Sequence, residues 1–352
     1  MNDILESLEK WRERDEQIGV ATVIETWGSA PRPVGSKLAA TLGGGIAGSV
    51  SAGCVEGAVI EESQEVVASG QPRLLTYGVA DDEAWEVGLA CGGTIKVFVE
   101  PFSALDGVYA SFKHYLEARQ PMAVVSVLDG PPDHLNRKLI VLPDGRTEGD
   151  LDVPGQAGEI VAAALDFLER EEGGTLELEG GTSLFVEVYP PVPRLIVVGA
   201  THIADALVSM GNAAGFDTIV VDPRAAFATE ERFPHAAELI REWPQQVLPE
   251  MGLDRSAYVV VLTHDPKFDD PTLQVALRSE ARYVGALGSR RTNEKRLGRL
   301  RKSGLTEEEL ARLHAPVGLP LGGRSPAEIA ISIMAEIVQV RNGVSTPQLA
   351  LE

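Results

Sequence analysis

The chain has 352 residues, of which 44% are hydrophobic, with a formal net charge of −21 and a sequence pI near 4.7. This length predicts about two domains, and the negative charge makes nucleic acid and anionic membrane lipids poor partners. No apolar run is long enough to cross a membrane, and two cysteines without close spacing fit a reducing compartment, so we expect a cytoplasmic protein.

The first part of the chain predicts alternating helices, strands and glycine loops. A charged amphipathic helix is expected over about 3–14, followed by a β-branched strand over 19–26 and a short strand over 37–41. The pattern VEGAVIEESQEVVASG predicts a helix over 55–70 with a glycine stop. A second glycine loop then leads into the strand TIKVFVEP at 94–101.

A later segment repeats this pattern. ARQPMAVVSVLDG parallels DEQIGVATVIETWG, RKLIVLPDGRTEG parallels SKLAATLGGGIAG, and GTSLFVEVYPP parallels GTIKVFVEPF. We therefore predict an internal repeat, 13–102 against 116–191, within an N-terminal α/β domain at 1–190. Chance similarity between two αβ units is the alternative. The second copy has no GSAPR and no cysteine, so we expect the chemistry in the first copy.

After the stiff linker PPVP at 190–193, strands and helices alternate. RLIVVGA, FDTIVVDPR, AYVVVLTHD and ARYVGALGS are the expected strands, so we predict a Rossmann-like doubly wound parallel sheet over 191–352. Two late helices carry start signals: Thr306 with Glu309, and Ser325 with Pro326 and Glu328.

The first turn of this second domain reads G-A-T-H-I-A and keeps one glycine of the dinucleotide fingerprint, Gly199. A helix from His202 would aim backbone N–H groups at an anion, with Thr201 in a usual glycine position. Asp222 ends the next strand about 20 residues on, where an acid binds a ribose hydroxyl. Arg224 would accept an extra phosphate or pair at the surface. A bound nucleotide such as NAD(P) is one expectation, and a non-binding Rossmann-like domain is the alternative.

Two later strands end in THD at 263–265 and GALGSRR at 285–291, at the carboxyl edge that lines the crevice of such a sheet. His264 and Asp265 are candidates for acid–base chemistry. The alternative is that these polar residues satisfy loop backbone, which we favour for Arg291 at the start of a basic helix. The candidates for holding phosphate here are Gly288, Ser289, Arg290 and Arg291.

Both cysteines lie in glycine-rich loops of the first repeat copy. Cys54 comes just before a helix, whose N-terminus favours a thiolate, and Cys91 lies in the loop GLACGG. Two such thiols can meet over one ligand beside Arg32 of GSAPR, a planar fork for phosphate or an oxo-anion. Buried structural cysteines are the alternative. We predict no metal site, because two thiols without a nearby histidine fall short of the four ligands of zinc.

The backbone around Cys54 is suited to a bulky ligand. Gly48 and Gly53 let the main chain approach it closely, and Ser49 and Ser51 offer hydroxyl groups. Catalytic or ligating roles are therefore expected for Cys54 and Cys91, with the surrounding glycine and serine residues as the cradle.

The combined motifs resemble the XdhC/CoxI family. GSAPRPVGSK, GGGIAGSVSAGCVEGAV and GLACGG resemble its N-terminal domain, and VVGATHIA, VVDPR, LTHDP, YVGALGSRR and APVGLPLGGRSPAEIAISIMAEI resemble its C-terminal Rossmann domain. The resemblance covers nearly the whole chain and is weakest over 105–190. The family's site residues carry over to Gly28, Ser29, Pro31, Arg32, Gly48, Ser49, Gly53, Cys54, Glu56, Cys91 and Gly92.

The resemblance implies an accessory factor for molybdenum hydroxylases such as xanthine dehydrogenase. Such a factor binds molybdenum cofactor, as molybdopterin or its dinucleotide form, assists the exchange of an oxo for a sulfido ligand, and delivers the cofactor to the apoenzyme. It implies a cysteine desulfurase as sulfur donor and a homodimer. Two departures matter: Thr201 stands where family members commonly have a second glycine, which counts against NAD(P) binding, and Ala52 stands where they tend to have glycine.

Three functions follow from these patterns. The first is a molybdenum-cofactor chaperone. The second is an NAD(P)-dependent oxidoreductase with His264 or Asp265 as acid or base and Asp222 on the ribose, which leaves the cysteine loops unexplained. The third is a non-catalytic module whose Rossmann domain docks a partner enzyme.

Overall fold

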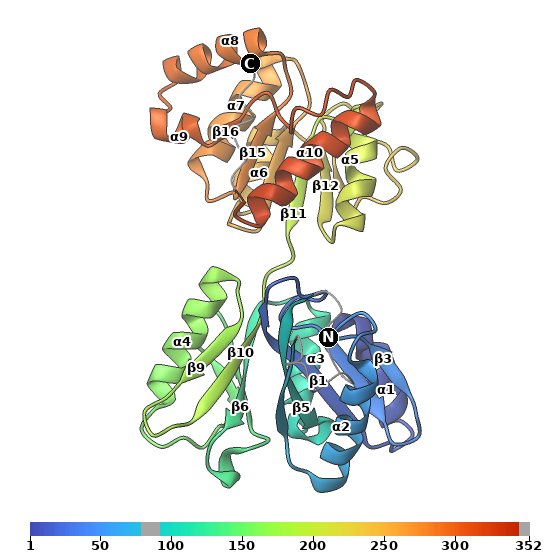
Figure 1. The fold of residues 1–352 in the computed structure, drawn as a ribbon. Coiled ribbons are helices and arrows are strands. Elements are labelled where there is room, and N and C mark those ends of the chain that lie inside the picture. The colour runs from blue at the N-terminus through green and yellow to red at the C-terminus, as the bar shows by residue number, and fades with distance from the viewer. Residues whose placement is uncertain (79–91, 345–352) are drawn as a thin grey trace. The chain divides into compact units, whose positions relative to one another are not determined.

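The computed structural model describes residues 1–78 and 92–344. The chain divides into two units, Met1–Pro191 and Val192–Glu352, each of which is described by itself (Figure 1). Within the described part of the chain, every helix is too short or too polar to span a lipid bilayer.

The first half of unit 1 is a five-stranded antiparallel sheet of order β3-β2-β1-β5-β4. Its strands β3 and β4 are short and were not predicted, because a three- or five-residue edge strand carries little alternation. The elements are α1 (Asn2–Arg12), β1 (Ile18–Trp27), β2 (Lys37–Thr41), β3 (Ile46–Gly48), α2 (Glu56–Ser69), β4 (Arg73–Tyr77), β5 (Thr94–Pro101) and a 3₁₀ turn (Phe102–Leu105).

The second half of unit 1 has the same order of elements and a sheet of order β8-β7-β6-β10-β9, which matches the first strand for strand. Two copies of one αβ unit would produce this correspondence. The elements are α3 (Tyr109–Glu117), β6 (Met122–Asp129), a 3₁₀ turn (Pro132–His134), β7 (Lys138–Val141), β8 (Thr147–Gly149), α4 (Ala157–Arg170), β9 (Gly174–Glu177) and β10 (Ser183–Tyr189).

Each half buries one face of its sheet under its own helix. Helix α2 packs on β1, β2 and β5, and α4 packs on β6, β7 and β10. The two halves meet through a large buried cluster that draws on α1, β1 and β2 of the first half and on α3, β6 and β7 of the second. They also meet through a small cluster to which each sheet gives one residue from its first strand and one from its last: Ile24, Phe98, Leu128 and Phe185. The matched strands thus face each other in matched positions.

Unit 2 is a six-stranded parallel sheet of order β13-β12-β11-β14-β15-β16, which confirms the predicted Rossmann-like fold. The chain runs outward from β11 on both sides, so the switch point lies at the ends of β11 and β14. The elements are β11 (Arg194–Val198), α5 (His202–Ala213), β12 (Asp217–Val221), β13 (Glu238–Ile240), α6 (Pro244–Glu250), β14 (Ala257–Val261), α7 (Pro266–Arg278), β15 (Tyr283–Ala286), α8 (Arg290–Lys302), α9 (Glu307–Ala311), β16 (Leu313–His314) and α10 (Pro326–Arg341).

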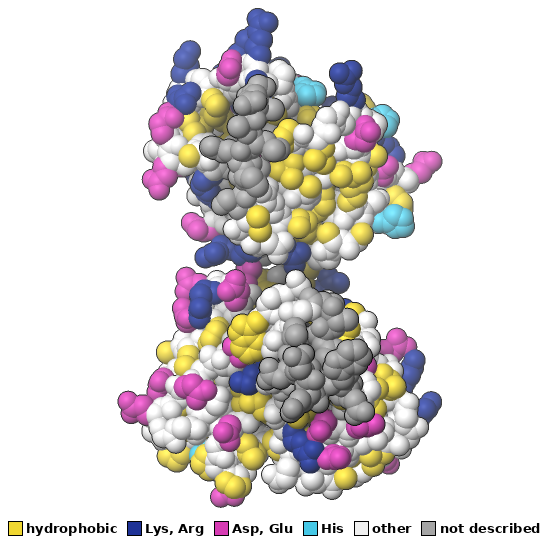
Figure 2. All heavy atoms as spheres, viewed as in Figure 1, with side chains coloured by type: hydrophobic (Ala, Val, Ile, Leu, Met, Phe, Trp, Pro, Cys, Tyr) yellow, Lys and Arg dark blue, Asp and Glu magenta, His cyan; other side chains and the backbone are white. Residues whose placement is uncertain are grey.

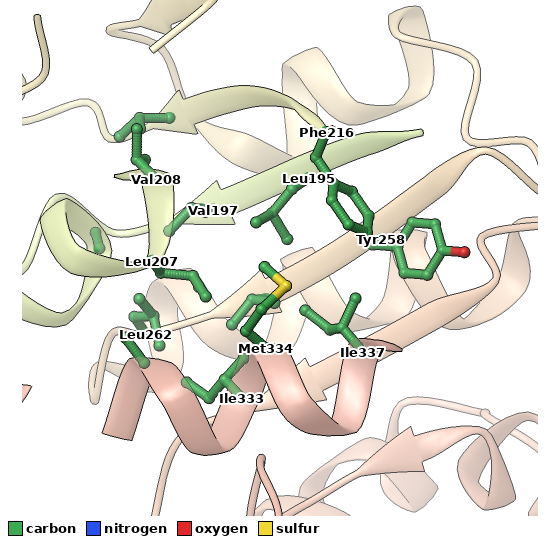
Figure 3. Close-up of a cluster of buried hydrophobic side chains, with 14 of the residues drawn as sticks. Leu195, Val197, Leu207, Val208, Phe216, Tyr258, Leu262, Ile333, Met334 and Ile337 are labelled. Atoms are coloured by element: carbon green, nitrogen blue, oxygen red, sulfur yellow. The ribbon is translucent and has the colours of Figure 1, made fainter. Parts of the chain in front are cut away.

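Both faces of this sheet are covered, as the unbroken apolar run in β11 requires. Alternate residues of β11 point to opposite sides: Leu195 and Val197 join a cluster with α5 and α10, in which Met334 lies among them (Figure 3), and Ile196 and Val198 join a cluster under α7 and α8. The predicted capping boxes at the starts of α9 and α10 are both formed, which confirms these helix starts.

Candidate functional site

All five strands of the first sheet have one end at the same edge, where β4 ends with Tyr77 paired to Ile95. Strand β1 ends there and β5 begins there, with Trp27 paired to Thr94. Strand β2 also begins and β3 ends at this edge, because each is antiparallel to its neighbour. Three glycine-containing segments therefore lie at the same edge: 28–36, 49–55 and 92–93.

The first of these segments touches the third and packs against a buried cluster to which the second contributes. A Cβ atom placed on Gly93 would lie 2.8 Å from the carbonyl oxygen of Ser29, so these two backbones are in direct contact. Ala30 packs against the buried cluster that contains Val50 and Val55. Cys91 lies outside the described residues, so the meeting of its thiol with Cys54 stays a prediction.

Glu56, in the first turn of α2, organises the loop before it. Its carboxylate accepts hydrogen bonds from the Ser49 hydroxyl at 2.6 Å, the Ser51 N–H at 2.9 Å, the Gly53 N–H at 2.8 Å and the Ser51 hydroxyl. Partial burial alone would raise the pKa of Glu56, but the hydrogen bonds from Ser49 and Ser51 outweigh it and lower the pKa to about 2. The side chain is therefore an anion at neutral pH that is held by its own loop, and its expected contact with a cofactor stays a prediction.

The hydroxyl groups of Ser49 and Ser51 also accept hydrogen bonds from backbone N–H groups of the loop. The buried Ser51 accepts hydrogen bonds from the N–H groups of Cys54 at 3.0 Å and Val55 at 2.9 Å, which caps donors that would otherwise be unsatisfied before α2. Ser49 accepts from the Ala52 N–H at 2.8 Å while it donates to Glu56. Ser49 thus stabilises the loop, and its predicted contact with a ligand stays a prediction.

Cys54 is exposed, and it is the free cysteine of the described residues. The loop reaches it through left-handed backbone at Ala52 (φ 58°) and Gly53 (φ 113°), and a Cβ at Gly53 would meet no atom within 4 Å. Gly48 differs, because a Cβ there would lie 2.2 Å from the Lys37 carbonyl oxygen. Internal packing therefore requires glycine at position 48, and the close approach of a ligand there stays a prediction. The thiol thus sits on a fixed loop beside open space.

The residues of the GSAPR segment lie in two different environments. Ser29 is exposed beside Gly28 (φ 66°) and Gly92 (φ 73°), at the edge shared with the cysteine loop. Pro31 is partly buried, and Arg32 lines an open cavity of about 620 Å³ whose other wall includes Glu187 and Tyr189. The described lining of this cavity contains no residue of 49–56, so this cavity is not the expected hollow beside Cys54, and that hollow stays a prediction.

In unit 2, the acid at the end of β12 is already engaged. Asp222 is 1% exposed, and its carboxylate accepts hydrogen bonds from the Ala200 N–H at 2.8 Å and from the Arg224 N–H and guanidinium at 2.6 to 2.9 Å. Burial would raise the pKa of Asp222, but the bonds from Arg224 and Ala200 lower it. The carboxylate ties the loop after β11 to the loop after β12, and its contact with a ribose stays a prediction. Arg224 pairs with this carboxylate, which is the second of the two roles expected for it.

The turn after β11 is built as a tight helix start. Gly199 has a φ of 106°, and a Cβ there would lie 2.5 Å from the Thr263 side chain, so close strand packing requires glycine. Thr201 caps α5 by accepting from the Ala204 N–H at 3.3 Å, and His202 is exposed in the first turn.

The later strand ends are mostly helix caps. Asp265 caps α7 by accepting from the Lys267 N–H at 3.0 Å, and Ser289 caps α8 by accepting from the Thr292 N–H at 3.2 Å. Gly288 precedes this cap with a φ of 150°. These caps favour the alternative that Asp265 and Ser289 satisfy backbone N–H groups of their loops. His264 is exposed and lines a cavity of about 260 Å³.

Two family models match the two units in turn. The model described as the XdhC and CoxI family matches residues 11–78, and the model described as the XdhC Rossmann domain matches residues 195–337. The chain belongs to the XdhC and CoxI family.

Relatives of this XdhC/CoxI-family chain match it along most of its length. It is 29% identical over 95% of its residues to a Bacillus subtilis protein named as a probable subunit of xanthine dehydrogenase, covering 96% of that protein. It is 29% identical over 92% of its residues to the Escherichia coli molybdenum cofactor insertion chaperone PaoD, covering 83% of it. A crystal structure from Bacillus halodurans described as a xanthine dehydrogenase matches 99% of the chain, and the chain covers 98% of it, at 29% identity with a TM-score of 0.73.

Two structural features of this XdhC/CoxI-family chain escaped the sequence analysis. Arg296 of α8 is 1% exposed and pairs with the buried Asp269 of α7 at 2.6 Å. The available signal was spacing: Asn293, Arg296 and Leu300 recur at intervals of three and four and form the buried side of α8. The second is Ser51, whose hydroxyl accepts hydrogen bonds from the N–H groups of Cys54 and Val55. Its position three residues before the cysteine could have suggested this role.

Proposed function

We propose that this chain is an accessory factor that binds molybdenum cofactor at the Cys54 loop, assists its sulfuration and inserts it into an apo molybdenum hydroxylase. The cofactor, as molybdopterin or its dinucleotide form, is the cargo. A cysteine desulfurase would supply the sulfur, in the cytoplasm. This proposal goes beyond the names of the relatives, one of which is called a molybdenum cofactor insertion chaperone.

The observation that supports it most is the exposed thiol of Cys54 on a loop fixed by Glu56. A thiolate is a soft ligand that suits a molybdenum centre. The hydrogen bonds from residues 49, 51 and 53 to one carboxylate hold the loop without using the sulfur. The chain therefore offers a ligating atom whose surroundings need not rearrange when cargo arrives.

The neighbouring segments suit the rest of such a cargo. Gly53 and Gly92 both face open space at their α-carbons, so a bulky planar pterin can lie against bare backbone. The exposed Ser29 lies at the same edge of the sheet. When bound, the cofactor would supply the oxo and sulfido chemistry of its metal, while Cys54 holds it and the glycine segments admit it.

The test is the activation of an apo-hydroxylase by the full chain. Protein made in a molybdate-fed host should carry molybdenum and a pterin, and should activate an apo molybdenum hydroxylase. Cys54→Ser should lose most of this activation without a change in melting temperature, whereas Thr147→Ser, on an exposed strand of the second half, should keep it. Full activation by Cys54→Ser would contradict the ligating role.

The two other predicted functions have their own tests. An NAD(P)-dependent oxidoreductase must bind the dinucleotide, and titration of NADH and NADPH by fluorescence measures this. The engaged carboxylate of Asp222 and the cap at Thr201 both weigh against it. A docking role for unit 2 and a homodimer stay predictions, which a pull-down with the hydroxylase and a measurement of molar mass would test.

A further inference from the structure

A concentration of positive charge lies in unit 2, on residues that the proposed cofactor role does not use. A cavity of about 260 Å³ opens at the carboxyl edge of the parallel sheet, between α7 and α8. Figure 2 shows Lys and Arg side chains projecting from the region where Figure 1 places α8. The residues of the lining that matter here are His264, Asp269, Arg291, Lys295, Arg296 and Arg299.

The cations of this cavity are only partly neutralised. Arg296 pairs with the buried Asp269, and Arg299 pairs with Asp270 through two bonds of 2.5 and 2.9 Å. Arg291 and Lys295 form no ion pair with any residue that the structure describes, and both are exposed. Their i, i+4 spacing puts them on the same side of α8. The lining therefore carries two uncompensated positive charges on a chain whose net charge is −21.

The lining of the cavity includes a buried side chain, Arg296, that has a donor without an acceptor among the described residues. The guanidinium of Arg296 donates to Asp269 at 2.6 Å and to the Leu287 carbonyl at 3.1 Å, and it also bonds Asn293. Its Nε–H is buried and has no acceptor among residues 1–78 and 92–344. Leaving a buried charged donor unsatisfied is costly, so an acceptor oxygen delivered by a ligand would stabilise this arrangement.

We propose that this cavity binds the dianionic phosphate group of a phosphate monoester. Arg291 and Lys295 supply the counter-charge, Arg296 supplies a buried donor, and the N-terminal turn of α8 adds its dipole. The cavity is smaller than the roughly 300–1,000 Å³ of sites that enclose a drug-sized ligand, so it holds the phosphate end while the rest of the ester stays outside. The loop after β11 is a poorer anion site, because the N–H of Ala200 already donates to Asp222.

The experiment is isothermal titration of the full chain with inorganic phosphate, AMP, CMP and adenosine. We expect the phosphate compounds to bind and adenosine, which lacks the phosphate, not to bind. Arg291→Gln and Lys295→Gln should each weaken AMP binding about tenfold, the loss expected for one charge-assisted hydrogen bond. Lys302→Gln removes the same charge from the exposed end of the same helix and should leave binding unchanged.

The outcomes separate the sources of the phosphate. Equal affinities for phosphate and AMP would identify the ion itself as sufficient, and tighter AMP binding would identify an ester; both support the site. Absence of binding by the wild-type chain at millimolar phosphate and AMP would overturn the proposal, as would equal weakening by Lys302→Gln. Because the readout is binding in unit 2, neither result depends on the cofactor role of Cys54.

Discussion

Lys37 and Glu187 form a buried ion pair between the two halves of unit 1. The Lys37 ammonium lies 2.9 Å from a Glu187 carboxylate oxygen and 2.8 Å from the Thr22 hydroxyl, and the two charged side chains are 4% and 13% exposed. Lys37 begins β2 and Glu187 lies in β10, so the pair joins the first sheet to the second.

An equivalent ion pair joins the halves a second time, with the lysine now in the second half and the glutamate in the first. Lys138, which begins β7, lies 2.6 Å from Glu100 of β5 and 2.6 Å from the Ser126 hydroxyl. Lys138 holds in its half the place that Lys37 holds in the first. The reciprocal pairs relate the two halves by a pseudo-two-fold symmetry, as expected where a duplicated unit packs on its own copy.

The first prediction concerns these pairs. Lys37→Met leaves the Glu187 carboxylate buried without its partner, so we expect it to lower the free energy of unfolding by about 3 kcal/mol. The double variant Lys37→Met/Glu187→Leu should regain most of that loss, because no unpaired charge remains. Urea unfolding measures both. Lys10→Met removes an exposed pair with Glu6, which solvent screens, and should have no measurable effect on stability. Equal costs for the buried and the exposed lysine would refute this prediction.

The second prediction concerns Glu56 and pH. Its pKa in the folded chain, about 2, lies below the ordinary value of 4.5, so its stabilising effect is present above about pH 4.5 and is lost as the pH falls toward 2. Glu56→Gln should therefore cost about 1–2 kcal/mol at pH 7, and the gap from wild type should narrow below pH 4.5. Denaturant melts at several pH values measure the gap. Glu61→Gln, exposed on the same helix, is the control; a gap independent of pH would refute the assignment.

The third prediction separates two glycines, Gly48 at the end of β3 and Gly53 in the cysteine loop. Gly48→Ala forces a Cβ to within 2.2 Å of the Lys37 carbonyl oxygen, so backbone must move and we expect a loss of about 3 kcal/mol or more. Gly149→Ala should behave alike, because its Cβ would lie 2.4 Å from the Lys138 carbonyl oxygen. Gly53→Ala meets open space and should cost only the left-handed strain, about 1–2 kcal/mol. Thermal melts should show this order, and the reverse order would contradict it.

Much of the fold was predictable from local pattern. The unbroken apolar run in β11 indicated a buried parallel strand, and Ser325 with Glu328 marked the start of α10, because both signals depend on residues near one another in sequence. The short strands β13 and β16 were not predictable, since two or three residues carry no measurable alternation. Their strand character comes from pairing with a longer neighbour.

The candidate site was predictable in position but less so in detail. The glycine and cysteine motifs indicated where the three segments are, yet residue type alone does not say which partner a polar group meets. Glu56 and Asp222 both looked available to a ligand, and both are engaged by backbone N–H groups of nearby loops. Arg32 likewise lines a cavity formed by residues of both halves, and the position of the second half beside it depends on tertiary packing that residue type does not reveal.

The central claim is that the sulfur of Cys54 holds the cargo, and alkylation of that thiol tests it most directly. The full chain is treated with iodoacetamide before and after loading with molybdenum cofactor, and modification of Cys54 is followed by mass spectrometry. An exposed thiol should react readily in the empty chain and become protected about tenfold or more when the cofactor occupies it. A chain that carries stoichiometric cofactor while Cys54 reacts at an unchanged rate would contradict the account.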